Sequence, residues 1–235
     1  MTKSQSQQDL LEKITNDILC GEFGPRERLV ESDIMKKYAA TRNAVRGVFK
    51  ELQMHKLLSH QPNRGVTVVR LTEKDAIDLY KVRALLESSA AYQIVAGMTE
   101  PRLEELRGLQ QLFISAVPKG DLRNISQANH SFHEKIFQSV ENLVLFDFIM
   151  DLRTRSNLLL YHIRRHPGKF EESVRDHNDL LAALTNRSPE DFIKVNSRHV
   201  MGSLHAYLAK PLAPLGLEEV AQGSFSSRDL LELLS

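Results

Sequence analysis

The sequence predicts a mainly α-helical protein made of two units. Apolar residues recur with helical spacing over most of the 235 residues, and only one short pair of segments alternates in the manner of strands. The charge also changes along the chain. Residues 1–70 carry 12 Lys and Arg against 8 Asp and Glu, whereas residues 71–235 carry 19 against 22. We therefore expect a basic unit over 1–70, an all-α unit over 71–210 and a C-terminal tail over 211–235.

The composition excludes several classes of protein. A single cysteine, Cys20, leaves no pair for an internal disulfide or a thiolate zinc finger. The apolar runs are too short for a transmembrane helix, and the first residues lack the apolar core of a signal peptide. We expect a cytoplasmic protein that makes no contact with membranes.

Three helices and a two-stranded ribbon are predicted in the basic unit. Thr41 is a suitable N-cap for the third helix, and residues 62–65 form the turn of the ribbon. This order of elements predicts a winged helix-turn-helix. The predicted elements are helices over 10–19, 31–38 and 42–58, then strands over 58–61 and 66–69.

A basic stripe marks the third helix, because Arg42, Arg46 and Lys50 are spaced by four and share one face. Such a stripe is usually only a solvated helix face. Here it accompanies a helix-turn-helix pattern and a turn that ends in Arg64-Gly65. Arginine near the start of a helix in the major groove can bind guanine O6 and N7, and a glycine lets the wing approach the DNA closely. The combination favours DNA binding.

Residues 21–31 and 40–49, with Arg64-Gly65, resemble the DNA-binding domain of GntR-type regulators. The resemblance implies double-stranded operator DNA as the partner. Asn43-Ala44 replaces the common Thr-Pro, and Ser32 stands where several members place an arginine, so a relative's operator sequence cannot be assumed. The DNA-binding residues that the resemblance implies are Arg28, Thr41, Arg42, Asn43, Arg46, Arg64 and Gly65.

The sequence predicts that the second unit is an all-α bundle, and its candidate functional residues are histidines. His133, His177 and His199 lie on three different predicted helices, and Asn129 lies one turn before His133. Scattered histidines are more often surface residues, but three imidazoles directed into a bundle core can bind zinc or another divalent metal. The predicted helices open at Thr72 and continue over 100–116, 122–140, 143–162, 170–184 and 189–209.

The stretches Asn129–His133, Asp176–Leu184 and His199 resemble the FCD class of C-terminal domains in GntR regulators, and the resemblance covers residues 75–209. It implies a divalent metal, with zinc as the first choice, bound by Asn129, His133, His177 and His199. Metal-binding members usually carry Asp where this chain has Asn129. An amide adds no negative charge, so the ion should bind less tightly and should require an anionic ligand.

Arg83 lies four residues before Glu87, and two interpretations are open. The pair can be a surface ion pair worth a few tenths of a kcal/mol. Alternatively, a buried Arg83 can bind a ligand carboxylate, and FCD relatives place an arginine here that faces the cavity. We expect the second role for Arg83, with Arg153 as a further effector-binding residue.

Together these features predict a homodimeric transcriptional regulator, expected to be a repressor, that binds an inverted-repeat operator. A small organic acid or sugar acid in a metal-containing pocket would control its affinity for DNA. Two alternatives stay open: a sensor whose effector is the metal ion, and a three-histidine metalloenzyme. No carboxylate stands at the HExxH spacing of a general base, and an enzyme would leave the winged helix unexplained. We therefore expect no enzymatic activity.

Overall fold

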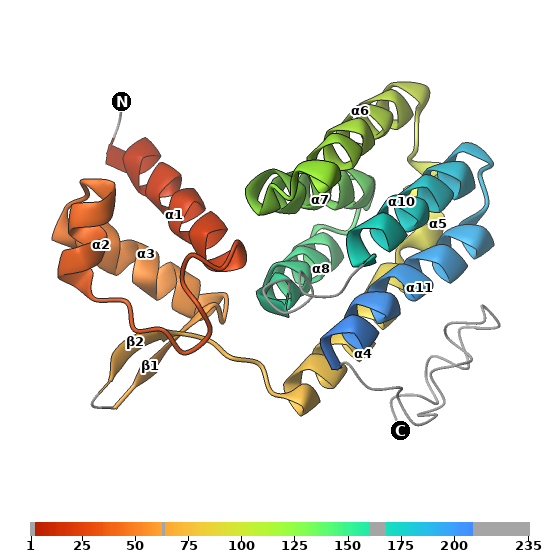
Figure 1. Cartoon of the computed structure of the whole chain (residues 1–235). Helices are drawn as coiled ribbons and strands as arrows, with labels where there is room; N and C mark the ends of the chain where they lie inside the picture. Colours follow the sequence, from red (N-terminus) through yellow and green to blue (C-terminus); the bar gives the residue numbers. More distant parts are fainter. Residues whose placement is uncertain (1–2, 63, 160–167, 209–235) are drawn as a thin grey trace. The chain divides into compact units, whose positions relative to one another are not determined.

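The computed structural model describes residues 3–62, 64–159 and 168–208, which form two compact units (Figure 1). Residues up to Thr72, together with 154–159, belong to the first unit. Residues 73–153, together with 168–208, belong to the second. The expected tail lies outside the described residues.

The first unit has the predicted winged helix-turn-helix, with three helices followed by a two-stranded ribbon. Its elements are α1 (Lys3–Leu19), α2 (Glu31–Tyr38), α3 (Arg42–Met54), β1 (Leu58–Gln61) and β2 (Gly65–Val68). Helix α3 ends at Met54 and not near Leu58 as predicted. Lys56 adopts a left-handed φ of 57°, which ends the helix and lets Leu58 begin β1.

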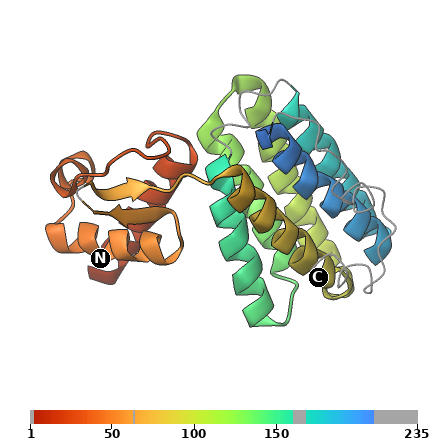
Figure 2. The same ribbon diagram turned by 90° about the horizontal axis from the view of Figure 1, so that it is seen from below.

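The core of the first unit lies between α1, α2 and α3. The buried residues recur with helical spacing, as Ile14 and Ile18 do on α1 and Val45, Val48 and Leu52 do on α3. Residues 26–29 extend the ribbon, which Figure 2 shows from below. The amide of Leu29 donates to Val66 O at 2.9 Å, and the amide of Val68 donates to Glu27 O at 2.9 Å.

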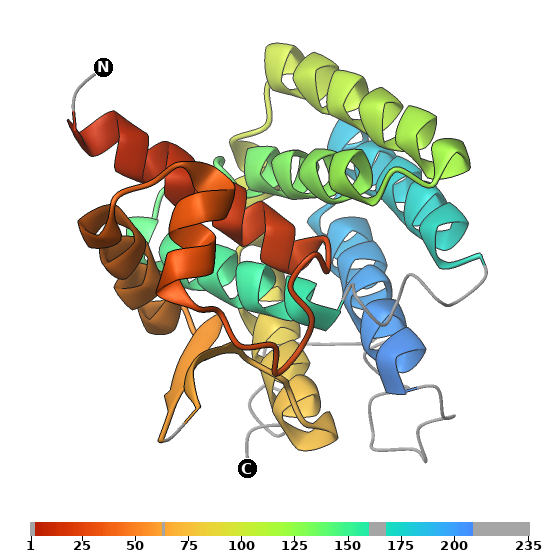
Figure 3. The ribbon, with the colours of Figure 1, turned by 60° about the vertical axis from the view of Figure 1, so that its left-hand side comes forward.

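The second unit is entirely helical within the residues that the structure describes. Helix α6 packs along α7, and α11 packs against both α10 and α4 (Figures 1 and 3). The core consists of aliphatic and phenylalanine side chains, among them Ile94, Leu106, Phe137 and Leu180. The elements are α4 (Glu73–Ser89), α5 (Ala91–Ala96), α6 (Glu100–Ala116), η1 (Val117–Lys119), α7 (Leu122–Phe137), α8 (Leu143–Ser156), α10 (Lys169–Thr185) and α11 (Pro189–Leu208). The last three residues of α8 and the short helix η2 (Asn157–Leu159) that follows it belong to the first unit.

The mainly α fold class with an N-terminal winged helix is thus confirmed. Within the described ranges, no helix has both the length and the apolar character that crossing a bilayer requires.

Candidate nucleic-acid interface and metal centre

Helix α3 begins with the predicted N-cap. The hydroxyl of Thr41 accepts a hydrogen bond from the Ala44 amide at 3.3 Å, and Thr41 itself has extended backbone angles. Val45 and Val48 hold the inner face of the helix in the core. The opposite face therefore exposes Arg42 and Arg46 to solvent.

Glu31 at the start of α2 contacts this basic face, which sequence reasoning did not anticipate. Arg46 Nε donates to both carboxylate oxygens of Glu31, at 2.8 and 3.0 Å, and Arg42 Nε lies 4.0 Å from Oε2. The hydrogen bond with Glu31, followed by its charge, raises the pKa of Arg46. Because α2 and α3 pack together, the ion pair with Glu31 fixes one edge of the Arg46 guanidinium.

The other side chains predicted to bind DNA are also exposed, and Arg28 and Arg64 lie at the wing with the half-buried Gly65. Arg64 lies at the turn, and Gly65 adopts a φ of 75° that a side chain would strain. The Arg28 guanidinium lies beside this turn, because a Cβ on Gly65 would lie 3.7 Å from Arg28 Nε. The pairing of residues 26–29 with β2 brings Arg28 there, and Asn43 is exposed on the first turn of α3.

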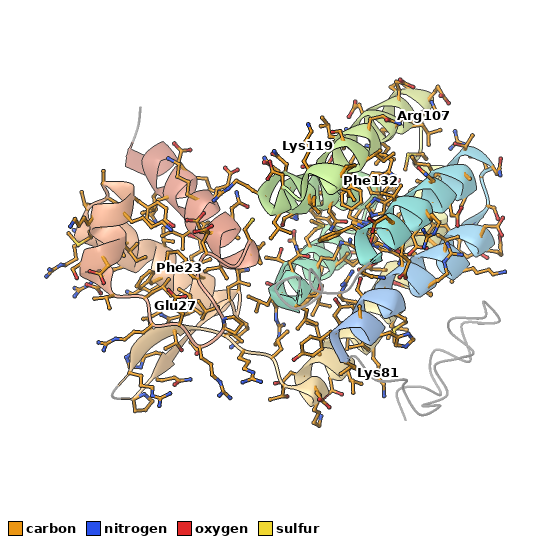
Figure 4. The ribbon with its side chains drawn as sticks, viewed as in Figure 1. Phe23, Glu27, Lys81, Arg107, Lys119 and Phe132 are labelled. Atoms are coloured by element: carbon orange, nitrogen blue, oxygen red, sulfur yellow. The ribbon has the colours of Figure 1, made fainter. Side chains whose placement is uncertain are left out.

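In the second unit, three histidines meet in the core. His133 on α7, His177 on α10 and His199 on α11 are at most 6% exposed, and one ring nitrogen from each lies within 4.8 Å of the others. His133 Nε2 is 3.1 Å from His199 Nε2. Phe132, labelled in Figure 4, stacks on His177 with ring centroids 4.4 Å apart. The structure therefore brings together the three histidines that the sequence singled out.

Hydrogen bonds fix the orientation of two of these rings. Gln110 on α6 donates its amide protons to Val174 O and Asn178 Oδ1, both at 3.1 Å, so its Oε1 accepts from His177 Nδ1 at 2.9 Å. Asp176 Oδ2 accepts from His199 Nδ1 at 3.3 Å. Each ring is thereby protonated on Nδ1 and directs the Nε2 lone pair inward.

Burial keeps the three imidazoles neutral. The pKa values of His133 and His177 lie well below the ordinary value, mainly because burial disfavours the charged ring, and the positive charge of Arg153 lowers them further. Burial also lowers the pKa of His199, although the hydrogen bond and charge of Asp176 oppose that effect. Neutral imidazole is the form that coordinates a metal.

This donor set fits a divalent metal ion. His177 Nε2 is buried without a hydrogen-bond partner in the described part of the chain, so it has an unused lone pair next to the other two rings. Zinc–nitrogen bonds of about 2.0–2.1 Å place neighbouring donors roughly 3.3 Å apart, similar to the spacing of His133 and His199. Asn129 lies half-buried on α7, one turn before His133.

The two candidate effector-binding arginines are buried and contact the same carboxylate. Arg83 Nε and Nη2 both lie 3.0 Å from Glu87 Oε1 on the same helix. Arg153 Nη1 lies 2.9 and 3.0 Å from the two oxygens of Glu87, and Asn196 Nδ2 donates to Oε2 at 2.9 Å. The Arg83–Glu87 pair therefore exists, but in the core and not at the surface.

Sequence reasoning missed Gln110, Asn196 and the second role of Glu87. The spacing of four between Arg83 and Glu87 was visible in the sequence, but Glu87 and Arg153 are 66 positions apart. Asp176 directly precedes His177 in the sequence, yet the histidine that it contacts is His199 on the next helix. These contacts depend on tertiary packing.

Comparison with known proteins agrees with this architecture. Residues 6–68 match the family described as bacterial regulatory proteins, gntR family, and residues 78–201 match the FCD domain. The Escherichia coli HTH-type transcriptional regulator McbR is 24% identical over 75% of this chain and 81% of its own length. The Bacillus subtilis gluconate operon transcriptional repressor is 27% identical over 65% of this chain and 64% of its own.

A solved structure of Escherichia coli McbR/YncC has the same fold, with a TM-score of 0.79 at 21% identity, and covers 89% of this chain and 99% of that one. Members of this family are DNA-binding transcriptional regulators and not enzymes. Small-molecule effectors act on such proteins through the FCD domain. The two matched domains together span both units, and this chain belongs to the GntR family of transcriptional regulators, with an FCD domain as its second unit.

Proposed function

We propose that this regulator is a cytoplasmic homodimer that binds an inverted-repeat operator through α3 and the wing. A small organic acid or sugar acid, bound beside a divalent metal in the second unit, controls the affinity of the protein for this operator. Zinc is the metal that the donor set favours. The observation that carries the proposal is the buried cluster of three neutral histidines next to two arginines and one glutamate.

The DNA half of the proposal rests on the exposed face of α3. Arg42, Asn43 and Arg46 lie on its first two turns, where side chains reach base edges when a helix enters the major groove. Arg28, Arg64 and the wing glycine would contact the backbone or the minor groove beside it. A twofold dimer matches an inverted repeat, and the exposed Leu143, Val144 and Phe148 on α8 give the second unit apolar surface for a second copy.

The positive charge of the site in the second unit supports an anionic effector. Arg83 and Arg153 place two guanidinium groups around Glu87. Asp176 is paired with Arg198 at 2.8 Å, so it adds little net negative charge. A divalent ion on neutral ligands would add two further positive charges. Such a site favours an anion, and the name of the gluconate operon repressor supports a sugar acid.

Effector binding and operator binding are linked reciprocally. If the effector changes operator affinity, operator binding must change effector affinity by the same factor. The histidine cluster equally supports a metal sensor, in which the ion alone shifts operator affinity. A titration with Zn²⁺ in the absence of any carboxylate distinguishes the two.

The test starts with selection of a binding duplex from a randomised pool, using the full-length protein. Fluorescence anisotropy then compares wild type with Arg46→Ala. The loss of one base contact in each half-site should cost about 2–6 kcal/mol per dimer. Arg107→Ala, an exposed arginine on α6, makes the same charge change outside the DNA-binding unit and should bind as wild type does. Equal affinity of wild type and Arg46→Ala would contradict the recognition-helix assignment.

A further inference from the structure

The carboxylate of Glu87 is wholly buried among side chains that would suit a ligand. It is 0% exposed, and it accepts hydrogen bonds from the guanidinium groups of Arg83 and Arg153 and from the amide of Asn196. These three donors come from α4, α8 and α11. Two arginines and an amide around one carboxylate are what a binding site for a free carboxylate needs.

Glu87 and Arg153 are both charged. Burial alone would raise the pKa of Glu87, but the charges of Arg153 and Arg83 outweigh it and lower the pKa, so Glu87 is ionised. Burial lowers the pKa of Arg153 to about 10, so it is charged at neutral pH. In addition, the buried Oδ1 of Asn196 has no hydrogen-bond partner among the described residues. An acceptor is therefore still available for the hydroxyl or amine of a ligand.

The helices divide the contacts of Glu87 into two groups. Glu87 and Arg83 lie one turn apart on α4, so their pairing needs no other helix. The contacts to Arg153 and Asn196 join α4 to α8 and α11. An external carboxylate can replace Glu87 at Arg153 and Asn196 while Glu87 stays paired with Arg83. One carboxylate is exchanged for another, so neither arginine is left with a buried, unpaired charge.

We propose that Glu87 is the protein's own occupant of a carboxylate-binding site, and that a carboxylate ligand of the second unit binds by replacing Glu87 at Arg153 and Asn196. This inference rests on the proposed function, since it assigns the place of the effector's carboxylate. The exchange breaks the bonds by which Glu87 joins α4 to Arg153 on α8 and to Asn196 on α11. Helix α4 begins at Glu73, five residues after the end of β2 at Val68, so the helix that carries Glu87 follows the wing directly in the chain.

The test uses acetate, because Glu87→Ala removes a methylene and a carboxylate and acetate supplies both. Thermal unfolding of the full-length protein is followed after dialysis against 1,10-phenanthroline, which removes metal without adding a carboxylate. Acetate should raise the Tm of Glu87→Ala by about 2–4 °C, the shift that roughly 1 kcal/mol of binding gives in a chain of this size. Chloride at equal ionic strength and neutral acetamide should give no such rise. Glu87→Ala/Arg153→Met should lose the response to acetate.

Glu87→Gln covers the case in which the alanine variant does not fold. It keeps the size of the side chain and removes the charge that competes with the ligand. The acetate concentration that gives half of the maximal stabilisation should be at least about tenfold lower for Glu87→Gln than for wild type. An acetate effect no larger than that of chloride in the folded variants, or equal half-saturation for Glu87→Gln and wild type, overturns the proposal.

Failure of this inference can be distinguished from failure of the proposed function. Affinity for the selected duplex is measured on the same preparations. Absence of the acetate effect with normal duplex binding overturns the carboxylate exchange alone. Rescue by acetate in a protein that selects no duplex supports the exchange and overturns the proposed function.

Discussion

A fall in pH from 7 to 5.5 should destabilise the metal-free protein, because its core holds neutral histidines. The pKa values of His133 and His177 lie well below normal in the folded state, chiefly through burial. In the unfolded chain they return to about 6.5. The unfolded state thus binds more protons below that pH, and the free energy of unfolding decreases as the pH falls through 6.5.

The size of the decrease in unfolding free energy follows from the difference between the histidine pKa values in the folded and unfolded states. For each histidine that stays neutral in the folded state, the free energy of unfolding falls by about 1 kcal/mol between pH 7 and pH 5.5, so the two together account for roughly 2–3 kcal/mol. Urea denaturation of the full-length protein, followed by circular dichroism after removal of metal, measures the change. The double variant His133→Gln/His177→Gln is the control, because its other titrating groups are those of wild type.

The comparison of wild type with this double variant tests whether His133 and His177 cause the loss of stability at low pH. The decrease in unfolding free energy should be roughly 2–3 kcal/mol larger in wild type than in the control. Equal decreases in the two proteins would refute the argument, since they would mean that His133 and His177 are not held neutral by burial.

Three further predictions concern the core and the metal centre. Leu52→Ala should lower the unfolding free energy by about 2–5 kcal/mol in urea denaturation, because Leu52 is 1% exposed in the core of the first unit; a loss below about 1 kcal/mol would contradict its placement. Asn129→Asp should bind Zn²⁺ at least about tenfold more tightly in competition with a chromophoric chelator, because it adds a negative charge; unchanged affinity would remove Asn129 from the ligand set. In the same competition assay, Gln110→Leu should weaken Zn²⁺ binding by about 10–100-fold through loss of the bond that orients His177, and wild-type affinity would exclude that role.

Most of the fold could be predicted from the sequence because its determinants are local. Helical spacing of apolar residues, the cap at Thr41 and the glycine turn at Gly65 each act over a few positions. The end of α3 was predicted too late. The apolar spacing continues through Leu57, whereas a left-handed Lys56, which carries no sequence signal of the glycine kind, ends the helix.

The candidate site could be predicted only in part. The three histidines were identifiable from their residue type and from the family resemblance, and the packing of α7, α10 and α11 brings them together. The partners that orient the histidines or pair with the arginines could not be predicted from the sequence. Gln110 contacts a histidine 67 positions away, and Glu87 contacts Asn196 across 109 positions. Only the tertiary structure contains that information, because no local spacing connects these residues.

The most direct test of the metal-centred account is the metal content of the purified full-length protein. Elemental mass spectrometry is carried out after equilibration with Zn²⁺ and desalting, on wild type, His177→Gln and the exposed-site control His205→Gln. We expect about one metal per chain in wild type and in the control, as three histidine ligands imply, and a large loss in His177→Gln. Equal metal content in wild type and His177→Gln, or no metal in wild type, would contradict the account.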